Sequence, residues 1–239
     1  MNNAGTTTSL NKQLEPLLRE RFHVREEVFE HAGMSLRILL PRAADELLDE
    51  EAFEKDERMP YWAELWPSAK ALARWLLDQP GFAPGMRVIE LGCGVGLPSL
   101  TLQSRGVNVL ASDYNDDALL FARANAHRNG LGELNTAMLD WRQPRAELGV
   151  FDLVLAADVL YEQRNALMLA ELLPCIMAPG GRFVLADPGR RHLPHFQEIM
   201  QCDGWQEMQL AELPEIQQLS TGLATSRIRV AAYEKAHRR

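Results

Sequence analysis

The feature that most constrains the fold of this chain is a glycine-spaced turn between a short apolar strand and a helix. The strand is predicted at Arg87–Leu91, and Gly92, Gly94 and Gly96 follow it directly. Glycine has no Cβ, so backbone there can approach a ligand closely, and the first turn of the helix offers N–H groups without helical partners. This order of elements predicts a site for a carboxylate- or phosphate-bearing ligand.

The rest of the chain from residue 86 alternates between strand and helix patterns. Short apolar strands interleaved with helices indicate an α/β fold with a parallel sheet covered on both faces. The last two strands have no helix between them, so we expect an antiparallel hairpin at the sheet edge. The other predicted strands are Val107–Ala111, Asn135–Leu139, Phe151–Ala156, Arg182–Ala186, Trp205–Leu213 and Arg227–Glu234, and the helices are Pro98–Ser104, Asp116–Arg128 and Asn165–Met177.

The residues before this region differ in pattern, and we predict two parts, an N-terminal extension at 1–59 and a ligand-binding domain at 60–239. Val24–Leu40 partly alternates around Ala32-Gly33, which predicts a β-hairpin. Residues 42–58 hold eight acids and three bases, in a chain with a net charge of −8. This acidic segment is interpreted as a solvated surface, or as one that steers a cationic substrate to the site. The acidity disfavours a nucleic-acid partner.

Several other classes of protein are disfavoured by the sequence. No stretch approaches the roughly 18 apolar residues of a membrane span, and residues 1–20 lack the apolar core of a signal peptide. We therefore predict a cytoplasmic protein with no membrane partner. Cys93, Cys175 and Cys202 have no paired spacing, so neither a disulfide framework nor a metal site is predicted.

A carboxylate at the end of the second strand indicates which ligand the glycine loop holds. Asp113 lies where it can accept hydrogen bonds from both ribose hydroxyls of a nucleotide. A dinucleotide fingerprint, read from Gly92, requires glycine at position 97, where this chain has Leu97. The spacing therefore disfavours a dinucleotide cofactor.

The G-x-G-x-G spacing after Glu90 resembles motif I of class I S-adenosylmethionine-dependent methyltransferases. The resemblance implies a Rossmann-like three-layer sandwich whose seven-stranded, mostly parallel sheet has the order 3-2-1-4-5-7-6. It also implies S-adenosylmethionine as cofactor, with Asp140 accepting from the adenine amino group, Trp141 bordering the ring and Trp66 near the sulfonium. The implied cofactor-binding residues are Trp66, Glu90, Gly92, Cys93, Gly94, Gly96, Asp113, Asp140, Trp141 and Ala157.

Three segments together are similar to the seven-β-strand protein-lysine methyltransferases: Tyr61–Pro67, Asp140-Trp141 and Asp158-Val-Leu-Tyr161. Asp187-Pro-Gly-Arg190, with Thr221–Ser226, is most similar to those acting on the electron-transfer flavoprotein β-subunit. The likeness implies a protein substrate related to that flavoprotein subunit, and we expect the protein itself to be a monomer. The likeness assigns catalysis to Asp158 and Tyr161, and substrate binding to Trp62 and Arg190.

Structural alternatives stay open for these residues. The three tryptophans can be core residues, Asp158 and Tyr161 a helix cap and a packing ring, and Asp187–Arg190 a plain turn. Two rival functions also remain. One is a small-molecule N-methyltransferase of the nicotinamide type, and the other is a non-catalytic cofactor-binding partner subunit.

Overall fold

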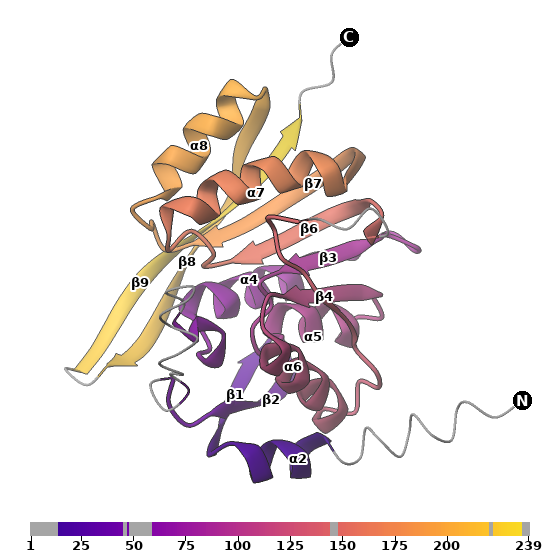
Figure 1. The fold of residues 1–239 in the computed structure, drawn as a ribbon, viewed down its shortest axis with the longest axis vertical. Coiled ribbons are helices and arrows are strands. Elements are labelled where there is room, and N and C mark those ends of the chain that lie inside the picture. The colour runs from indigo at the N-terminus through magenta and orange to yellow at the C-terminus, as the bar shows by residue number, and fades with distance from the viewer. Residues whose placement is uncertain (1–13, 45–46, 48–58, 144–147, 220–221, 236–239) are drawn as a thin grey trace, which may run out of the picture.

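Seven strands form one mixed sheet in the order β5-β4-β3-β6-β7-β9-β8 (Figure 1). The computed structural model describes residues 14–44, 47, 59–143, 148–219 and 222–235. Numbered along the chain within this sheet, the order is 3-2-1-4-5-7-6, so the predicted topology is confirmed. β9 runs antiparallel to both of its neighbours, and the other adjacent strands are parallel. The strands are β3 (Val88–Leu91), β4 (Val109–Asp113), β5 (Asn135–Met138), β6 (Phe151–Ala157), β7 (Met177–Asp187), β8 (Trp205–Leu219) and β9 (Gly222–Lys235).

Helices cover both faces of the sheet, with α4, α5 and α6 on one face and α7 and α8 on the other (Figure 1). Alternate residues of the central strands belong to separate hydrophobic clusters. Leu155 packs with the cluster under α4, α5 and α6, whereas Val154 packs with the cluster under α7 and α8. The period-2 alternation of strand side chains thus fills two cores. The helices are α4 (Pro67–Asp78), α5 (Leu97–Ser104), α6 (Asp116–Arg128), α7 (Gln163–Ile176) and α8 (Leu193–Cys202).

The predicted N-terminal hairpin is present and is preceded by the helix α2 (Leu14–Arg21). Strands β1 (Val24–His31) and β2 (Met34–Pro41) pair around a turn at Ala32 and Gly33, whose φ angles are 49° and 80°. Residues of β2 are buried in the same core as α6. The boundary predicted after residue 59 therefore does not separate two hydrophobic cores.

One asparagine of α6 joins the hairpin to the glycine loop. The side-chain oxygen of Asn125 accepts from Leu39 N at 2.7 Å, and its Nδ2 donates to Leu39 O at 3.0 Å and to Val95 O at 3.1 Å. Asn125 is fully buried. One side chain thus provides hydrogen-bond partners for the N–H and C=O of Leu39 in β2 and for the C=O of Val95 in the glycine loop.

Among the helices that connect strands of the sheet, the structure adds one to the prediction, and it also lengthens the tail hairpin. Helix α8 was not predicted, and β8 continues beyond Leu213 to Leu219. Strand β9 begins at Gly222, so several residue pairs of the hairpin lie beyond Asp187↔Arg229, the last pair of β7 with β9. The carboxyl edge of the sheet is therefore flanked by a two-stranded arm (Figure 1).

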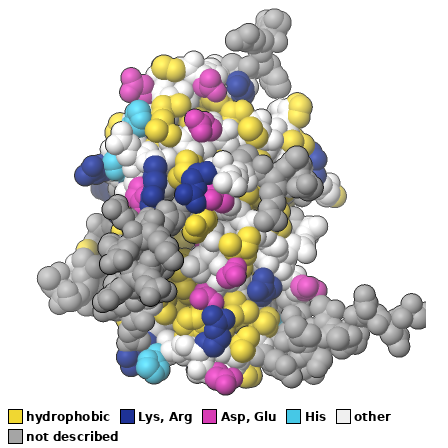
Figure 2. Space-filling model, viewed as in Figure 1, with side chains coloured by type: hydrophobic (Ala, Val, Ile, Leu, Met, Phe, Trp, Pro, Cys, Tyr) yellow, Lys and Arg dark blue, Asp and Glu magenta, His cyan; other side chains and the backbone are white. Residues whose placement is uncertain are grey.

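Charged side chains on the surface alternate in sign rather than forming a field of one sign on the face shown in Figure 2. Ion pairs such as Arg128 with Glu15 and Lys70 with Glu27 link neighbouring elements. The acids of the predicted acidic segment lie outside the described residues. No described helix has the length and apolar character needed to cross a membrane.

Candidate active site

The glycine loop between β3 and α5 has the left-handed backbone that its composition predicts. Gly92, Gly94 and Gly96 have φ angles of 66°, 51° and 92°. A Cβ at Gly94 would lie 3.1 Å from the carbonyl oxygen of Trp62, and one at Gly96 would lie 2.9 Å from Ala122 Cβ. Both conformation and close packing therefore require glycine at this turn.

Asp113, the last residue of β4, connects this loop to the next crossover. Its Oδ2 accepts from Gly94 N at 2.9 Å, and its Oδ1 accepts from Asn115 N at 3.0 Å. Asn115 in turn caps α6 by accepting from Asp117 N at 2.8 Å. The carboxylate is thereby oriented by two backbone amides at the carboxyl edge of the sheet.

Glu90 is a buried acid beneath the glycine loop. Its Oε2 accepts from Ser99 N at 2.9 Å and also from the Ser99 hydroxyl. Burial, together with the nearby charge of Asp113, raises the pKa of Glu90 to about 8. A carboxyl group in this state is mostly protonated at neutral pH and adds little negative charge to the site.

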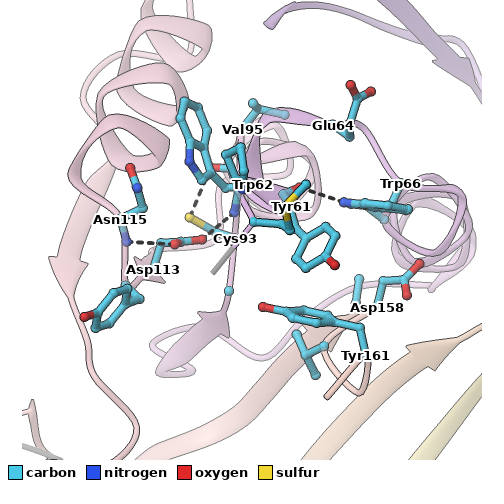
Figure 3. A pocket seen from close by; sticks show the side chains of 18 of the residues that line it. Tyr61, Trp62, Glu64, Trp66, Cys93, Val95, Asp113, Asn115, Asp158 and Tyr161 are labelled. Atoms are coloured by element: carbon cyan, nitrogen blue, oxygen red, sulfur yellow. Dashed lines mark hydrogen bonds between the residues drawn. The ribbon is translucent and has the colours of Figure 1, made fainter. Parts of the chain in front are cut away.

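A cavity of about 830 Å³ runs along this edge of the sheet. Figure 3 shows Asp113 and Asn115 at one end and Trp66 and Asp158 at the other, with the rings of Tyr61 and Tyr161 between them. All but two of the predicted site residues line the cavity. Those lining it are Trp62, Trp66, Glu90, Gly92, Cys93, Gly94, Asp113, Asp140, Trp141, Ala157, Asp158 and Tyr161.

Asp140 and Trp141, which follow the end of β5, also line the cavity. Asp140 forms an ion pair with Arg142 at 2.7 Å. A Cβ at Gly92 would lie 3.7 Å from the Trp141 indole, so the indole lies against the glycine loop. The side chain of Cys93 is buried in the same loop, and burial raises the pKa of its thiol. Cys93 is therefore a small apolar wall, not a thiolate.

Asp158 lies at the other end, directly after β6, with a φ of 60°. Its carboxylate oxygens are held separately: Ser68 Oγ donates to Oδ2 at 3.1 Å, and Arg190 Nε donates to Oδ1 at 2.6 Å. Only 3% of the Asp158 side chain is exposed. A buried, doubly held carboxylate facing a cavity is a candidate acceptor for a donor group of a substrate.

Aromatic rings surround this carboxylate. The ring centroids of Tyr61 and Tyr161 are 4.6 Å apart, and those of Tyr61 and Trp66 are 6.1 Å apart. Trp66 Nε1 donates to Tyr61 O at 2.8 Å, which fixes the indole at the start of α4. Tyr161 lines the cavity and is 38% exposed, so this end of the cavity reaches the surface.

The two predicted residues that do not line the cavity are Gly96 and Arg190. Gly96 caps α5 and packs on Ala122. Arg190, predicted to bind the substrate, has its guanidinium on Asp158 of its own chain and 5.4 Å from the Trp66 ring centroid. The two roles are compatible, because 34% of the Arg190 side chain is exposed.

Sequence reasoning missed Ser68 and Tyr61 as site residues. Ser68 is the second residue of α4, and its hydroxyl donates to Asp158. Only the proximity of Ser68 to Trp66 in the sequence hinted at the site. Among the residues that the structure describes, no three His, Cys, Asp or Glu side chains are grouped to hold a metal ion.

Comparisons with known proteins agree with this geometry. A family model described as lysine methyltransferase matches residues 49–199. The electron transfer flavoprotein beta subunit lysine methyltransferase of Rattus norvegicus is 34% identical over 227 residues, covering 92% of this chain and 84% of that protein.

Solved structures show the same fold. The ribosomal protein L11 methylase of Lactobacillus delbrueckii subsp. bulgaricus has a TM-score of 0.53 at 20% identity, with 71% of this chain and 79% of that chain covered. The magnesium protoporphyrin IX methyltransferase of Synechocystis PCC 6803, solved with bound SAM, has a TM-score of 0.52 at 21% identity, covering 77% of this chain and 83% of that chain.

Proposed function

This chain belongs to the lysine methyltransferase family, and from that premise we propose that it transfers a methyl group from S-adenosylmethionine to a lysine side chain of a protein. The observation that carries the proposal is the arrangement of one cavity with two unlike ends. A glycine loop and Asp113 form one end, and a buried carboxylate beneath aromatic rings forms the other. Such a cavity suits a nucleoside at one end and an amine at the other.

The residues present fit this cofactor. Gly92 and Gly94 line the cavity without side chains of their own, so backbone there can lie against a ligand, and the Asp113 carboxylate suits the hydroxyls of a ribose. Asp140, Trp141 and Trp66 line the same cavity; in this proposal Asp140 and Trp141 contact the adenine and Trp66 the end that carries the sulfonium. When bound, S-adenosylmethionine would supply a methyl group activated by its positive sulfur; the amine nitrogen would bond to the methyl carbon as the carbon–sulfur bond breaks, and S-adenosylhomocysteine would leave.

The chain must present the lysine amine without its extra proton. At neutral pH the neutral form costs about 4.6 kcal/mol, because the ordinary lysine pKa lies about 3.4 units above 7. A pocket walled by Tyr61, Tyr161 and Trp66 favours the neutral form by excluding water. Asp158 then accepts a hydrogen bond from the amine and directs its lone pair along the transfer axis.

The open acceptor end favours a protein substrate over a small molecule. Tyr161 is both a wall of the cavity and exposed, so a slender unbranched side chain can enter from the surface. The curated relatives are named for the electron transfer flavoprotein beta subunit, and we propose a related protein as the substrate. A monomer, a cytoplasmic location and the absence of a nucleic-acid partner stay predictions from the sequence.

A labelling experiment tests this function. The purified protein is incubated with S-adenosylmethionine carrying a tritiated methyl group and either the flavoprotein β-subunit or a cell extract, and products are separated on a gel. Label on a lysine of the subunit, located by mass spectrometry, supports the full proposal. Label on another protein would refute the flavoprotein substrate, and label only in the low-mass fraction would refute a protein substrate altogether. Cofactor binding without turnover would favour the partner-subunit alternative.

A further inference from the structure

Arg190 is held on three sides at the point where β7 ends, and it contacts the carboxylate assigned to the acceptor amine. We propose that Arg190 is a positioning residue that acts through Asp158: it fixes the carboxylate and offsets its charge. The inference rests on the proposed function and deepens it, because it states how the site accepts a lysine amine without stabilising the ammonium form.

The geometry around Arg190 is unusually restrictive for an arginine near the surface. Its Nε donates to Asp158 Oδ1 at 2.6 Å, and its guanidinium carbon lies 5.4 Å from the Trp66 ring centroid. Its backbone N donates to Asp187 Oδ1 at 2.7 Å, as does Gly189 N. Asp187 therefore shapes the turn, the turn places Arg190, and Arg190 holds Asp158.

The orientation of Asp158 leaves capacity for a substrate. Ser68 donates to one oxygen and Arg190 to the other. Each carboxylate oxygen has about two acceptor sites, so both oxygens keep one for an amine hydrogen. With both protein contacts in place the carboxylate cannot rotate, and the hydrogen bond it accepts sets the direction of the amine lone pair.

The charge of Arg190 solves an electrostatic problem of this site. A lone buried carboxylate would favour ammonium over amine and raise the pKa of the substrate lysine. Only the neutral amine can attack the methyl carbon. A guanidinium in contact with the carboxylate brings the net charge of the pair close to zero, so the amine loses its proton more readily.

The other ionisable groups near Asp158 do not supply this positive charge. Glu64 pairs with Arg25, and Glu162 with Arg164, so these acids are matched locally. Asp187 is buried, and burial together with the charge of Asp158 raises the pKa of Asp187. The ionisable or charged side chains around the acceptor end, among the residues described, are Tyr61, Glu64, Tyr161, Glu162, Asp187 and Arg190.

Two variants and a matched control test the role. Arg190→Gln removes the charge, and Arg190→Lys keeps it without the planar fork. Arg182→Gln is the control, since Arg182 lies within β7, is not among the residues that line the cavity, and pairs with Glu234 of β9. For each variant, kcat and KM are measured as a function of pH with the acceptor protein identified by labelling. Binding of S-adenosylhomocysteine and the melting temperature are measured on the same samples.

We expect Arg190→Gln to move the acid limb of the kcat profile to higher pH by about one unit, since a neighbouring charge shifts a pKa by about 1–3 units. Arg190→Lys should recover part of this shift, while Arg182→Gln and cofactor binding should match the wild type. An increase of KM alone, with the limb unmoved, would overturn the proposal and favour direct anchoring of an acidic substrate group.

A double variant separates action through Asp158 from general damage. In an Asp158→Asn background, Arg190→Gln should cause little further loss of kcat, because the group it acts through is already neutral. The proposal would be overturned if the double variant lost kcat by the product of the two single losses. It would also be overturned if the acid limb of the kcat profile stayed in place in both Arg190 variants. Wild-type turnover in the same assay tests the proposed function separately, so the two failures are distinguishable.

Discussion

Gly94 N donates a hydrogen bond of 2.9 Å to Oδ2 of Asp113, and this bond joins the loop after the first strand of the sheet to the end of the second. The bond fixes both parts of the predicted nucleoside seat at once. The other carboxylate oxygen, Oδ1, accepts from Asn115 N, so both oxygens of Asp113 are held beside the cavity.

Asp113→Asn should weaken binding of S-adenosylhomocysteine by tenfold or more, because a hydrogen bond to a charged group contributes about 1.5–3 kcal/mol. The amide keeps one acceptor oxygen but loses the charge and the second acceptor. Calorimetry on the purified protein measures the effect. Asp152→Asn is the control, since Asp152 pairs with Arg87 away from the cavity. Equal affinities of the two variants for S-adenosylhomocysteine would contradict a role of Asp113 in binding the nucleoside.

Asp158→Asn should lower kcat by about 100-fold while cofactor affinity stays near that of the wild type, since it removes an interaction with the reacting amine. Asparagine is preferred to alanine here, because Asp158 has a φ of 60° and asparagine tolerates that region. Turnover and cofactor binding are measured on the same sample. An unchanged kcat would exclude Asp158 from the acceptor site.

Gly96→Ala should destabilise the fold by roughly 1–3 kcal/mol, the usual cost of a strained backbone. The added Cβ would lie 2.9 Å from Ala122 Cβ, and φ is 92°. Gly81→Ala is the matched control, because its Cβ would have no atom within 4 Å. Urea unfolding of both variants measures the difference. A Gly96 variant as stable as the control would show that the loop can shift.

Glu90→Gln should become more stable relative to the wild type as pH rises from about 5 to 8. In the folded protein the pKa of Glu90 is about 8, against an ordinary value of 4.5. The folded state therefore binds the proton more tightly, and stability from this group is full below pH 4.5 and is lost toward pH 8. The variant lacks this loss, which is on the order of a few kcal/mol. Melting temperatures of both proteins, measured from pH 5 to 8, check this prediction. Parallel plots of melting temperature against pH for the two proteins would contradict it.

The sheet order could be predicted from local sequence signals, and so could the meeting of most predicted site residues in one cavity. The glycine spacing, the strand-ending Asp113 and the Asp158–Tyr161 segment each lie at a carboxyl end of a parallel strand, and such ends meet at one edge. Topology therefore converts separate sequence positions into one cavity.

The pairing of Arg190 with Asp158 was not predictable from the residues alone. Nothing in the Asp187-Pro-Gly-Arg190 turn distinguishes an arginine aimed at substrate from one aimed at its own chain. Helix α8 was missed because Pro194 and the preceding turn residues suggested continued loop, although proline is well tolerated in a first helical turn. The tail hairpin was underestimated because Glu215 and Gln217 interrupt the apolar pattern.

Asn125 gives the N-terminal hairpin a consequence for the catalytic half of the chain. Its buried side-chain amide accepts from Leu39 N and donates to Leu39 O and to Val95 O of the glycine loop. Trimming the protein to residues 60–239 would leave that amide short of partners and bare an apolar side of α6. We therefore expect a chain that begins at residue 60 to fold less stably than one that includes β1 and β2.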